Sequence, residues 1–251
     1  MYADDLILLT SSVSDLQTML QICDLAGRYL GIEFNPSKSK YILISPNINI
    51  QPSTLSIGQF QLPWVDKLDY LGITLTSANS FTIDLSNIRR KFFTSVNSIL
   101  SKCTFTSDMV KLCLLESHCL PILLYATESL NLPKSQITVL NSWWNSVYRK
   151  IFNYHKWESV RSLISLLGRL DLHHIINLKT LNFIVKMSEC PFTPEPLRNY
   201  LNNVYKFSNE CTSVFMKFNC YGIRCPHKIK RKLYDDFNLS CTTPPSSPVT
   251  D

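Results

Sequence analysis

The hydrophobic pattern of this chain changes period part of the way along, and the change divides the sequence in two. From residue 6 to residue 76 the apolar residues form short runs separated by turn residues. Such runs indicate strands. From residue 85 onward apolar residues recur every three or four positions, which indicates amphipathic helices. The sequence therefore predicts an α+β part followed by a helical bundle.

One helix is predicted inside the first part. Leu16, Leu20 and Cys23 belong to an apolar face with helical spacing, which predicts a helix from Ser14 to Leu30. Ser14 and Gln17 have the spacing of a capping box at its start, and Gly31 follows its end.

Short strands are predicted on both sides of this helix. Leu6–Leu9 is expected to form a buried strand, paired with Tyr2-Ala3 across an Asp4-Asp5 turn. Asn35-Pro36-Ser37 reads as a turn. Further strands are predicted at Ile32–Phe34, Tyr41–Ile44, Thr54–Ile57, Phe60–Leu62 and Leu68–Leu75.

The second part is predicted to be helical nearly throughout. Ser107 is expected to cap one helix, and Pro121 to kink it. The predicted helices are Leu85–Leu100, Val110–Leu130, Gln136–Phe152, Glu158–Leu167 and Leu172–Ser188. The proline- and serine-rich end, residues 236–251, is expected to be disordered.

Composition narrows the setting. The chain has 251 residues and a formal charge of +6, a mild excess of base that favours a polyanionic partner without requiring one. Its nine cysteines follow no secretory signal, so we expect reduced thiols and an intracellular protein, nuclear or cytoplasmic. No apolar stretch reaches the length of a membrane span, so no membrane partner is expected.

The adjacent carboxylates Asp4 and Asp5 are the first candidate for chemistry. Two neighbouring carboxylates repel each other, and a divalent cation held by oxygen ligands would offset that repulsion. An Asp-Asp turn exposed to solvent is the alternative. These residues alone favour neither interpretation.

The residues that follow carry a family resemblance. Several segments in this order are similar to the reverse transcriptases of LINE-type (non-LTR) retrotransposons: Tyr2–Asp5, Leu30–Lys40, Pro63–Val65, Tyr70–Ile73, Ile88–Lys91 and Leu120–Tyr125. A single segment of this kind would be weak support, whereas an ordered series is strong. The resemblance implies a partial polymerase palm followed by a thumb-like helical bundle, and it implies RNA-directed DNA polymerisation.

The resemblance also assigns roles. Asp4 and Asp5 would bind the catalytic magnesium ions, and Lys38 would lie near the leaving pyrophosphate. Tyr2 and Ala3 would lie beneath the primer end. Leu71, Gly72 and Ile73 would form the primer grip, a hairpin that presses on the primer strand. The bland alternatives are an exposed turn lysine and an ordinary core strand.

The implied thumb begins with basic residues. Arg89, Arg90 and Lys91 would contact the backbone of the template–primer, although a solvated helix face explains their spacing equally well. On this basis residues 1–80 are the partial palm, 81–155 the thumb-like helices, 156–235 a C-terminal helical region and 236–251 the tail.

The part of the family's active site that lies upstream of Tyr2 has no counterpart here. In the family, one essential aspartate comes from an upstream strand, so we expect this chain to be inactive alone. The intact enzyme would use magnesium, an RNA template, a DNA primer and deoxynucleotides. The alternative is a non-enzymatic module that binds nucleic acid or another partner.

Two weaker signals lie near the C-terminus. Cys211, Cys220, Cys225 and His227 are close in sequence, but their spacing fits no common zinc site, so structural thiols are favoured over zinc. The basic run Arg224–Lys232 could contact nucleic acid or act as a nuclear signal, although such runs are usually just solvated. The sequence suggests no partner for His173 or His174.

Overall fold

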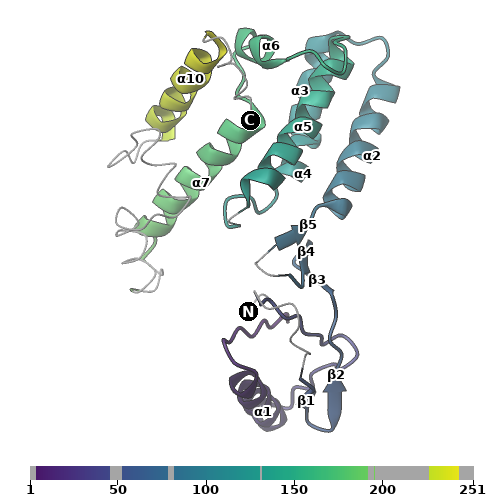
Figure 1. Cartoon of the computed structure of the whole chain (residues 1–251), viewed down its shortest axis with the longest axis vertical. Helices are drawn as coiled ribbons and strands as arrows, with labels where there is room; N and C mark the ends of the chain where they lie inside the picture. The colour runs from purple at the N-terminus through teal and green to yellow at the C-terminus, as the bar shows by residue number, and fades with distance from the viewer. Residues whose placement is uncertain are drawn as a thin grey trace, which may run out of the picture. The chain divides into compact units, whose positions relative to one another are not determined.

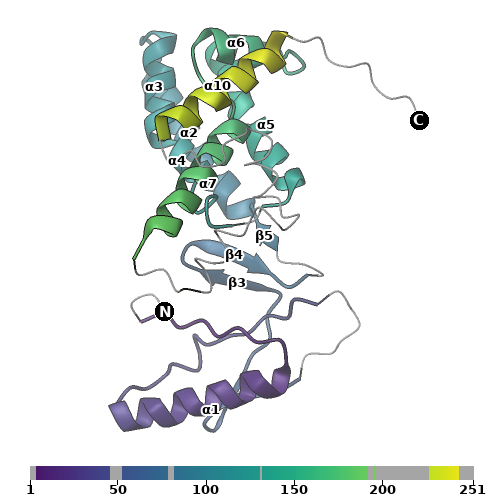
Figure 2. The ribbon, with the colours of Figure 1, turned by 90° about the vertical axis from the view of Figure 1, so that its left-hand side faces the viewer.

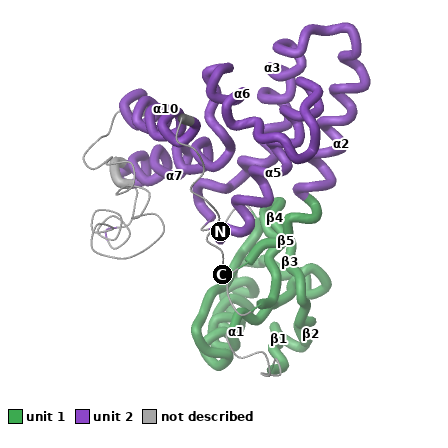
Figure 3. The backbone as a smooth tube through the Cα atoms, turned by 45° about the horizontal axis from the view of Figure 1, so that its top comes forward, with its two compact units in different colours: residues 1–87 green, residues 88–251 purple. Residues whose placement is uncertain are grey.

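The structure is a computed structural model that describes residues 4–45, 53–78, 82–130, 132–191, 195 and 226–242. The chain divides into two compact units, Met1–Asn87 and Ile88–Asp251, drawn in green and purple in Figure 3. Helices dominate the described residues, and the two small antiparallel sheets both belong to the first unit. The fold is therefore mixed α+β.

Helix α1, Val13–Leu30, forms where the sequence predicts a helix, but its start differs from the prediction. The cap is Ser12, whose side chain accepts a hydrogen bond from the Asp15 N–H, so the predicted capping box is wrong. At the other end Gly31 adopts φ 68°, the left-handed conformation that ends many helices.

Gln17, the other half of the predicted capping box, instead joins α1 to the neighbouring hairpin. Its side-chain amide donates to the Ser56 carbonyl (2.8 Å) and accepts from the Ser56 N–H (2.9 Å). These two bonds satisfy one backbone unit of an edge strand that has no further strand beside it among the described residues.

The first sheet is the predicted hairpin of β1, Leu55–Ile57, and β2, Phe60–Leu62. The strands pair antiparallel with Ile57 opposite Phe60, so Gly58 and Gln59 form the turn. Its buried face and α1 enclose a small apolar cluster, with Leu8, Leu16, Phe34 and Tyr41 packed around it. The buried members are Leu20, Leu55, Ile57 and Leu62.

The second sheet has the order β3, Lys67–Tyr70; β4, Ile73–Thr76; and β5, Thr82–Asp84. The single strand predicted over Leu68–Leu75 is therefore wrong. A two-residue turn at Leu71 and Gly72 folds it into a hairpin in which Tyr70 pairs with Ile73. Apolar residues occur on both sides of this turn, which is why the pattern reads as one run.

Three predicted strands at the start of the chain do not form as predicted. Leu6–Leu9 and Ile32–Phe34 have no regular secondary structure, and Tyr41–Ile44 makes one isolated bridge, between Tyr41 and Trp64. Leu9 is 79 % exposed. A strand is stable only when a neighbour accepts and donates its backbone hydrogen bonds, and the described residues supply no such neighbour here.

The second unit is helical in all its regular described segments (Figures 1 and 2). The boundary between the units follows Asn87 and so falls within the first turn of helix α2 (Ser86–Lys102), which is counted here with the second unit. The helices are α2, Ser86–Lys102; α3, Asp108–His118; α4, Leu120–Leu123; α5, Lys134–Ile151; α6, Arg161–Leu166; α7, Leu172–Glu189; and α10, Pro226–Thr242.

These helices confirm most of the predicted periodicity. Ser107 caps α3 by accepting a hydrogen bond from the Val110 N–H. The single helix predicted to Leu130 ends earlier, because Pro121 belongs to the separate short helix α4 and turns follow it. The core is built from fully buried side chains of several helices: Phe92, Val96, Leu112, Leu115, Leu140, Trp144, Val147, Ile164, Leu172 and Leu181.

Helix α10 corrects the prediction for the end of the chain. Residues 236–242, assigned to the disordered tail, are helical. Ile229, Leu233 and Phe237 recur every four residues and are fully buried, and α10 packs against α6 and α7. The charged residues between them hid this apolar stripe in the sequence.

Candidate nucleic-acid interface

Asp4 and Asp5 are exposed at the start of the described chain, in the segment before α1. Tyr2 and Ala3 lie outside the described residues. Within the described ranges no third Asp, Glu, His or Cys joins Asp4 and Asp5 in a group that could hold a metal ion. A magnesium ion takes six oxygen ligands, and a two-ion centre needs carboxylates that bridge both ions. Asp4 and Asp5 therefore do not make a catalytic magnesium site by themselves.

Lys38 lies in the predicted turn. The Asn35 side chain accepts hydrogen bonds from the N–H (3.0 Å) and hydroxyl (2.6 Å) of Ser37, and the Asn35 carbonyl accepts from the Lys38 N–H (3.2 Å). This local network fixes the turn and leaves Lys38 exposed. Lys38 is available to an anion, and the ammonium group has no ion-pair partner within the described residues.

Leu71 and Gly72 occupy the tip of the β3–β4 hairpin, and Ile73 begins β4. Both tip residues have positive φ, 46° for Leu71 and 77° for Gly72, as a type I′ turn requires. Glycine adopts this conformation freely, whereas leucine does so at a cost. The fold therefore holds an apolar side chain at a tight, strained tip.

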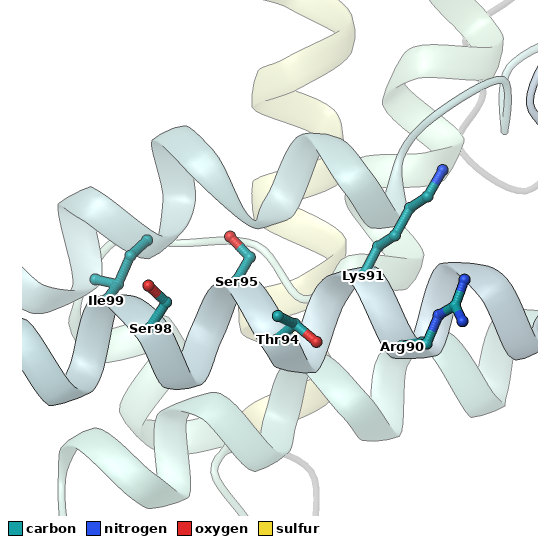
Figure 4. Close-up of a pocket in the computed structure, with 6 residues that line it drawn as sticks. All are labelled: Arg90, Lys91, Thr94, Ser95, Ser98 and Ile99. Carbon is teal, nitrogen blue, oxygen red and sulfur yellow. The ribbon is translucent and has the colours of Figure 1, made fainter.

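Arg89, Arg90 and Lys91 are all exposed on the first turns of α2. The structure places two of them, Arg90 and Lys91, on the wall of an open groove with a volume of about 530 Å³, and Arg89 does not line it. Figure 4 shows the two cations at one end of the groove, hydroxyl side chains in the middle and Ile99 at the other end. The remaining lining residues are Thr94, Ser95, Ser98 and Ile99.

Arg90 and Lys91 give the groove a positive charge, and α2 contains no acidic residue that would offset it. Its hydroxyl groups can donate hydrogen bonds to an anion, although Ser95 also accepts one from the Cys119 thiol (3.2 Å). The two cations and the hydroxyl groups on this exposed face of α2 can contact the phosphate backbone of a nucleic acid.

No partner for His174 is predicted from the sequence, yet this side chain makes a buried polar junction. Its Nδ1 lies 2.5 Å from Asp171 Oδ1 and its Nε2 lies 3.1 Å from Asp236 Oδ2 on α10. Asp171 also caps α7 by accepting from the His174 N–H (2.9 Å). Burial acts to raise the pKa of Asp171, but the hydrogen bonds and charge of His174 outweigh it and lower this pKa.

Asp171, His173 and His174 are close enough to hold a metal ion, but their contacts favour a structural role. Both ring nitrogens of His174 already face carboxylates, and His173 Nδ1 lies 3.4 Å from the Asn177 amide. The group also sits at the start of α7, where the helix dipole disfavours a cation. The Asp-x-x-His spacing at a helix start was the signal available in the sequence.

A smaller cavity of about 210 Å³ lies in the second unit, between helices of its core. Arg169 Nε donates to Glu116 Oε1 across its wall (2.8 Å), and Tyr148 lines it beside them. Burial raises the pKa of the Tyr148 phenol. Because Glu116 already neutralises Arg169, this cavity has less net charge than the α2 groove.

The predicted C-terminal signals are only partly described. Cys211, Cys220, Cys225 and Arg224 lie outside the described residues, so the zinc group is not visible as a whole. His227 is exposed in the first turn of α10. The rest of the basic run belongs to this helix, where Lys228, Lys230 and Arg231 are exposed while Ile229 is buried.

Comparison with protein-family models, curated proteins and solved structures finds no match to this chain. Among the described helices, none is both long enough and apolar enough to cross a membrane.

Proposed function

We propose that this chain is part of an RNA-directed DNA polymerase of a LINE-type retrotransposon, and that its contribution is to hold the template–primer. The ordered series of motifs from Tyr2-Ala3-Asp4-Asp5 through Leu71-Gly72-Ile73 carries the proposal. Its partners are an RNA template, a DNA primer and, in the intact enzyme, deoxynucleotides.

The β3–β4 hairpin is the element proposed to press on the primer. Gly72 has no side chain, so a backbone phosphate or sugar can approach the tip closely. The strained Leu71 conformation supports a role for the tip, because strained backbone geometry is concentrated at functional sites. This proposed contact with the primer involves residues of the first unit alone.

The α2 groove is the element proposed to hold the duplex. Arg90 and Lys91 neutralise phosphates at one end, while Thr94 and Ser98 donate hydrogen bonds further along. Contacts of this kind fix position and carry no sequence information. Binding should therefore depend strongly on salt and weakly on sequence.

The test is duplex affinity measured against salt concentration. We expect log affinity to fall linearly with log salt, with a slope of about −0.9 for each phosphate neutralised. The variant Arg90→Ala/Lys91→Ala should bind every duplex more weakly. It should also make the slope less steep by about 1.8, the contribution of two phosphate contacts. The matched control is Lys228→Ala/Arg231→Ala, which removes two exposed charges from α10.

Loss of affinity in the α10 variant alone would show that the groove assignment is wrong. Adding Arg89→Ala to the groove variant separates the lining pair from its neighbour. Little further loss is expected, because Arg89 does not line the groove.

Catalysis by the isolated chain is tested separately. We expect no extension of a DNA primer on an RNA template with magnesium and deoxynucleotides, because Asp4 and Asp5 do not complete a two-ion site. Extension that disappears in Asp4→Ala would contradict this expectation.

A non-enzymatic nucleic-acid-binding module is the second candidate. One observation favours it, since the groove is formed by residues of the second unit and needs none of the palm-like residues. Coexpression with a candidate upstream polypeptide would discriminate: activity dependent on Asp4 supports the polymerase, and unchanged duplex binding without activity supports the module.

A further inference from the structure

The loop between α5 and α6 presents aromatic side chains to solvent. Tyr154, His155 and Trp157 are all exposed, and Trp157 is 81 % exposed. The rings of His155 and Trp157 stack on each other, with centroids 5.0 Å apart and planes 2° from parallel. The flat indole of Trp157 is open to solvent, whereas the core of the same unit buries Trp144 almost completely.

The loop that carries this stack is held by hydrogen bonds to its own ends. The Tyr154 N–H donates to the Arg149 carbonyl (3.0 Å), and Arg149 Nε donates to the Glu158 carbonyl (2.9 Å). The Glu158 carboxylate accepts from the His155 N–H (2.5 Å). Asn153 takes φ 56°, which reverses the chain after α5. These bonds hold the backbone of the loop, and the two rings stack on each other without a ligand.

Positive charge lies beside the rings. Lys156 stands between His155 and Trp157 in sequence, is exposed, and makes no ion pair within the part of the chain that the structure describes. In the last turn of α5, Arg149 donates to the Glu158 carbonyl of the loop, whereas Lys150 donates to Asn97 of α2 (3.2 Å). The Glu158 carboxylate accepts from the His155 N–H and keeps its negative charge, so Lys156 is the exposed cation of the loop beside the two aromatic rings.

We propose that His155 and Trp157 form a stacking platform for an unpaired base of a nucleic-acid strand, with Lys156 on the adjoining phosphate. The proposal rests on the proposed function only in taking nucleic acid as the partner. Aromatic side chains bind single strands because every base offers a flat face, whereas the bases of a duplex are already stacked on each other. The platform therefore serves a single-stranded segment, and the α2 groove serves the duplex.

The experiment uses the full chain and two fluorescent 12-nucleotide probes, oligothymidylate and an abasic strand of equal length. The abasic strand keeps the phosphates and removes the bases. Trp157→Ala should weaken binding of oligothymidylate by about tenfold, a loss within the range found when one aromatic ring that stacks on a base is removed. Binding of the abasic strand should not change. Trp157→Phe should retain most of the affinity. Lys156→Ala should weaken both probes and flatten the salt dependence.

The matched control is Phe105→Ala, which removes a fully exposed aromatic side chain from the loop between α2 and α3. It should leave both probes unchanged. Equal losses in Phe105→Ala and Trp157→Ala, or a Trp157→Ala loss as large on the abasic strand, would overturn the platform. So would Trp157-dependent binding to phosphatidylserine vesicles without any effect on oligothymidylate.

The duplex measurement separates this proposal from the proposed function. If duplex binding depends on Arg90 and Lys91 but Trp157→Ala leaves single-strand binding intact, the platform is wrong and the proposed function stands. If duplex binding is absent while oligothymidylate binding depends on Trp157, the groove assignment fails and the platform stands. Absence of binding to every probe would overturn both.

Discussion

The two units of this chain cover their apolar residues very differently. In the second unit the helices enclose a continuous set of fully buried side chains, among them Phe92, Leu115 and Trp144. In the first unit α1 buries little more than Leu20, whereas Tyr29 on the opposite side of the helix is 90 % exposed. The difference shows that a helix forms from its own sequence, whereas a strand forms only beside another strand.

A helix satisfies its backbone hydrogen bonds internally, so it needs neighbours only to cover its apolar stripe. A strand needs a partner for the backbone itself. In the second unit most of the predicted helices formed, although the one predicted over Val110–Leu130 is replaced by α3, α4 and turns. In the first unit the strands that formed are those with an antiparallel partner close in sequence, β1–β2 and β3–β4–β5. Leu6–Leu9 has no strand partner among the described residues and is irregular.

Substitutions in the core of the second unit should cause the largest loss of stability. Trp144→Ala is expected to lower the free energy of unfolding by about 3–5 kcal/mol, because it removes a fully buried aromatic side chain and leaves a cavity. Urea unfolding measures the loss. Trp157→Ala is the control, with an expected change within about 0.5 kcal/mol for an exposed position. Equal effects of the two variants would contradict the contrast between core and loop.

A substitution in the core of the first unit should cause a smaller loss of stability. Leu20→Ala is expected to cost about 2 kcal/mol, at the low end for buried leucine, because its cluster is small and partly open. Hydrogen exchange of the β1–β2 amides would report it. Leu25→Ala removes the same atoms from an exposed position of the same helix and should cost under about 0.5 kcal/mol. A larger Leu25 effect would show that the outer face of α1 is covered in solution.

The polar junction of the second unit comes next. His174→Ala is expected to cost about 1–2 kcal/mol, because it leaves the carboxylates of Asp171 and Asp236 without their shared partner. The loss should appear as faster hydrogen exchange in α10. His173→Ala, its half-buried neighbour, should have a smaller effect on α10.

The same junction predicts an acid dependence. The pKa of Asp171 is lowered in the folded protein, so the stability it contributes is present above its unfolded pKa, about 3.9, and is lost as pH falls toward the folded value. His173, His174 and Asp236 are the titratable groups that surround it. Asp171→Asn keeps a good helix cap and should reduce the acid-induced loss of stability. Unfolding curves at pH 3 and pH 6 measure the difference.

The smallest expected effect lies at the β3–β4 tip. Leu71→Asn should stabilise the first unit by about 0.5–1 kcal/mol, because asparagine tolerates positive φ better than leucine. Gly72→Ala should destabilise it by a similar amount. Hydrogen exchange of the hairpin amides measures both. If Leu71→Asn also weakens binding of a primer–template, the strain is retained for function.

The sequence was enough to predict most helices of the second unit, the tight hairpin of β1 and β2, and the exposure of the basic residues on α2. It was not enough for α10. Its buried positions, Ile229, Leu233 and Phe237, are one residue in four among charged neighbours, and only packing against α6 and α7 shows them to be core.

By itself the sequence determined local structure wherever periodicity or a short turn fixes the backbone hydrogen bonds. It also supplied the candidate residues, from Asp4 and Asp5 to Lys91. Tertiary structure alone decided which of them meet. The helical period of α2 already places Arg90 and Lys91 on one face without Arg89, whereas only packing joined His174 to Asp236 across 62 positions of the chain. Proximity between distant residues depends on how elements pack, and that information is absent from any local pattern.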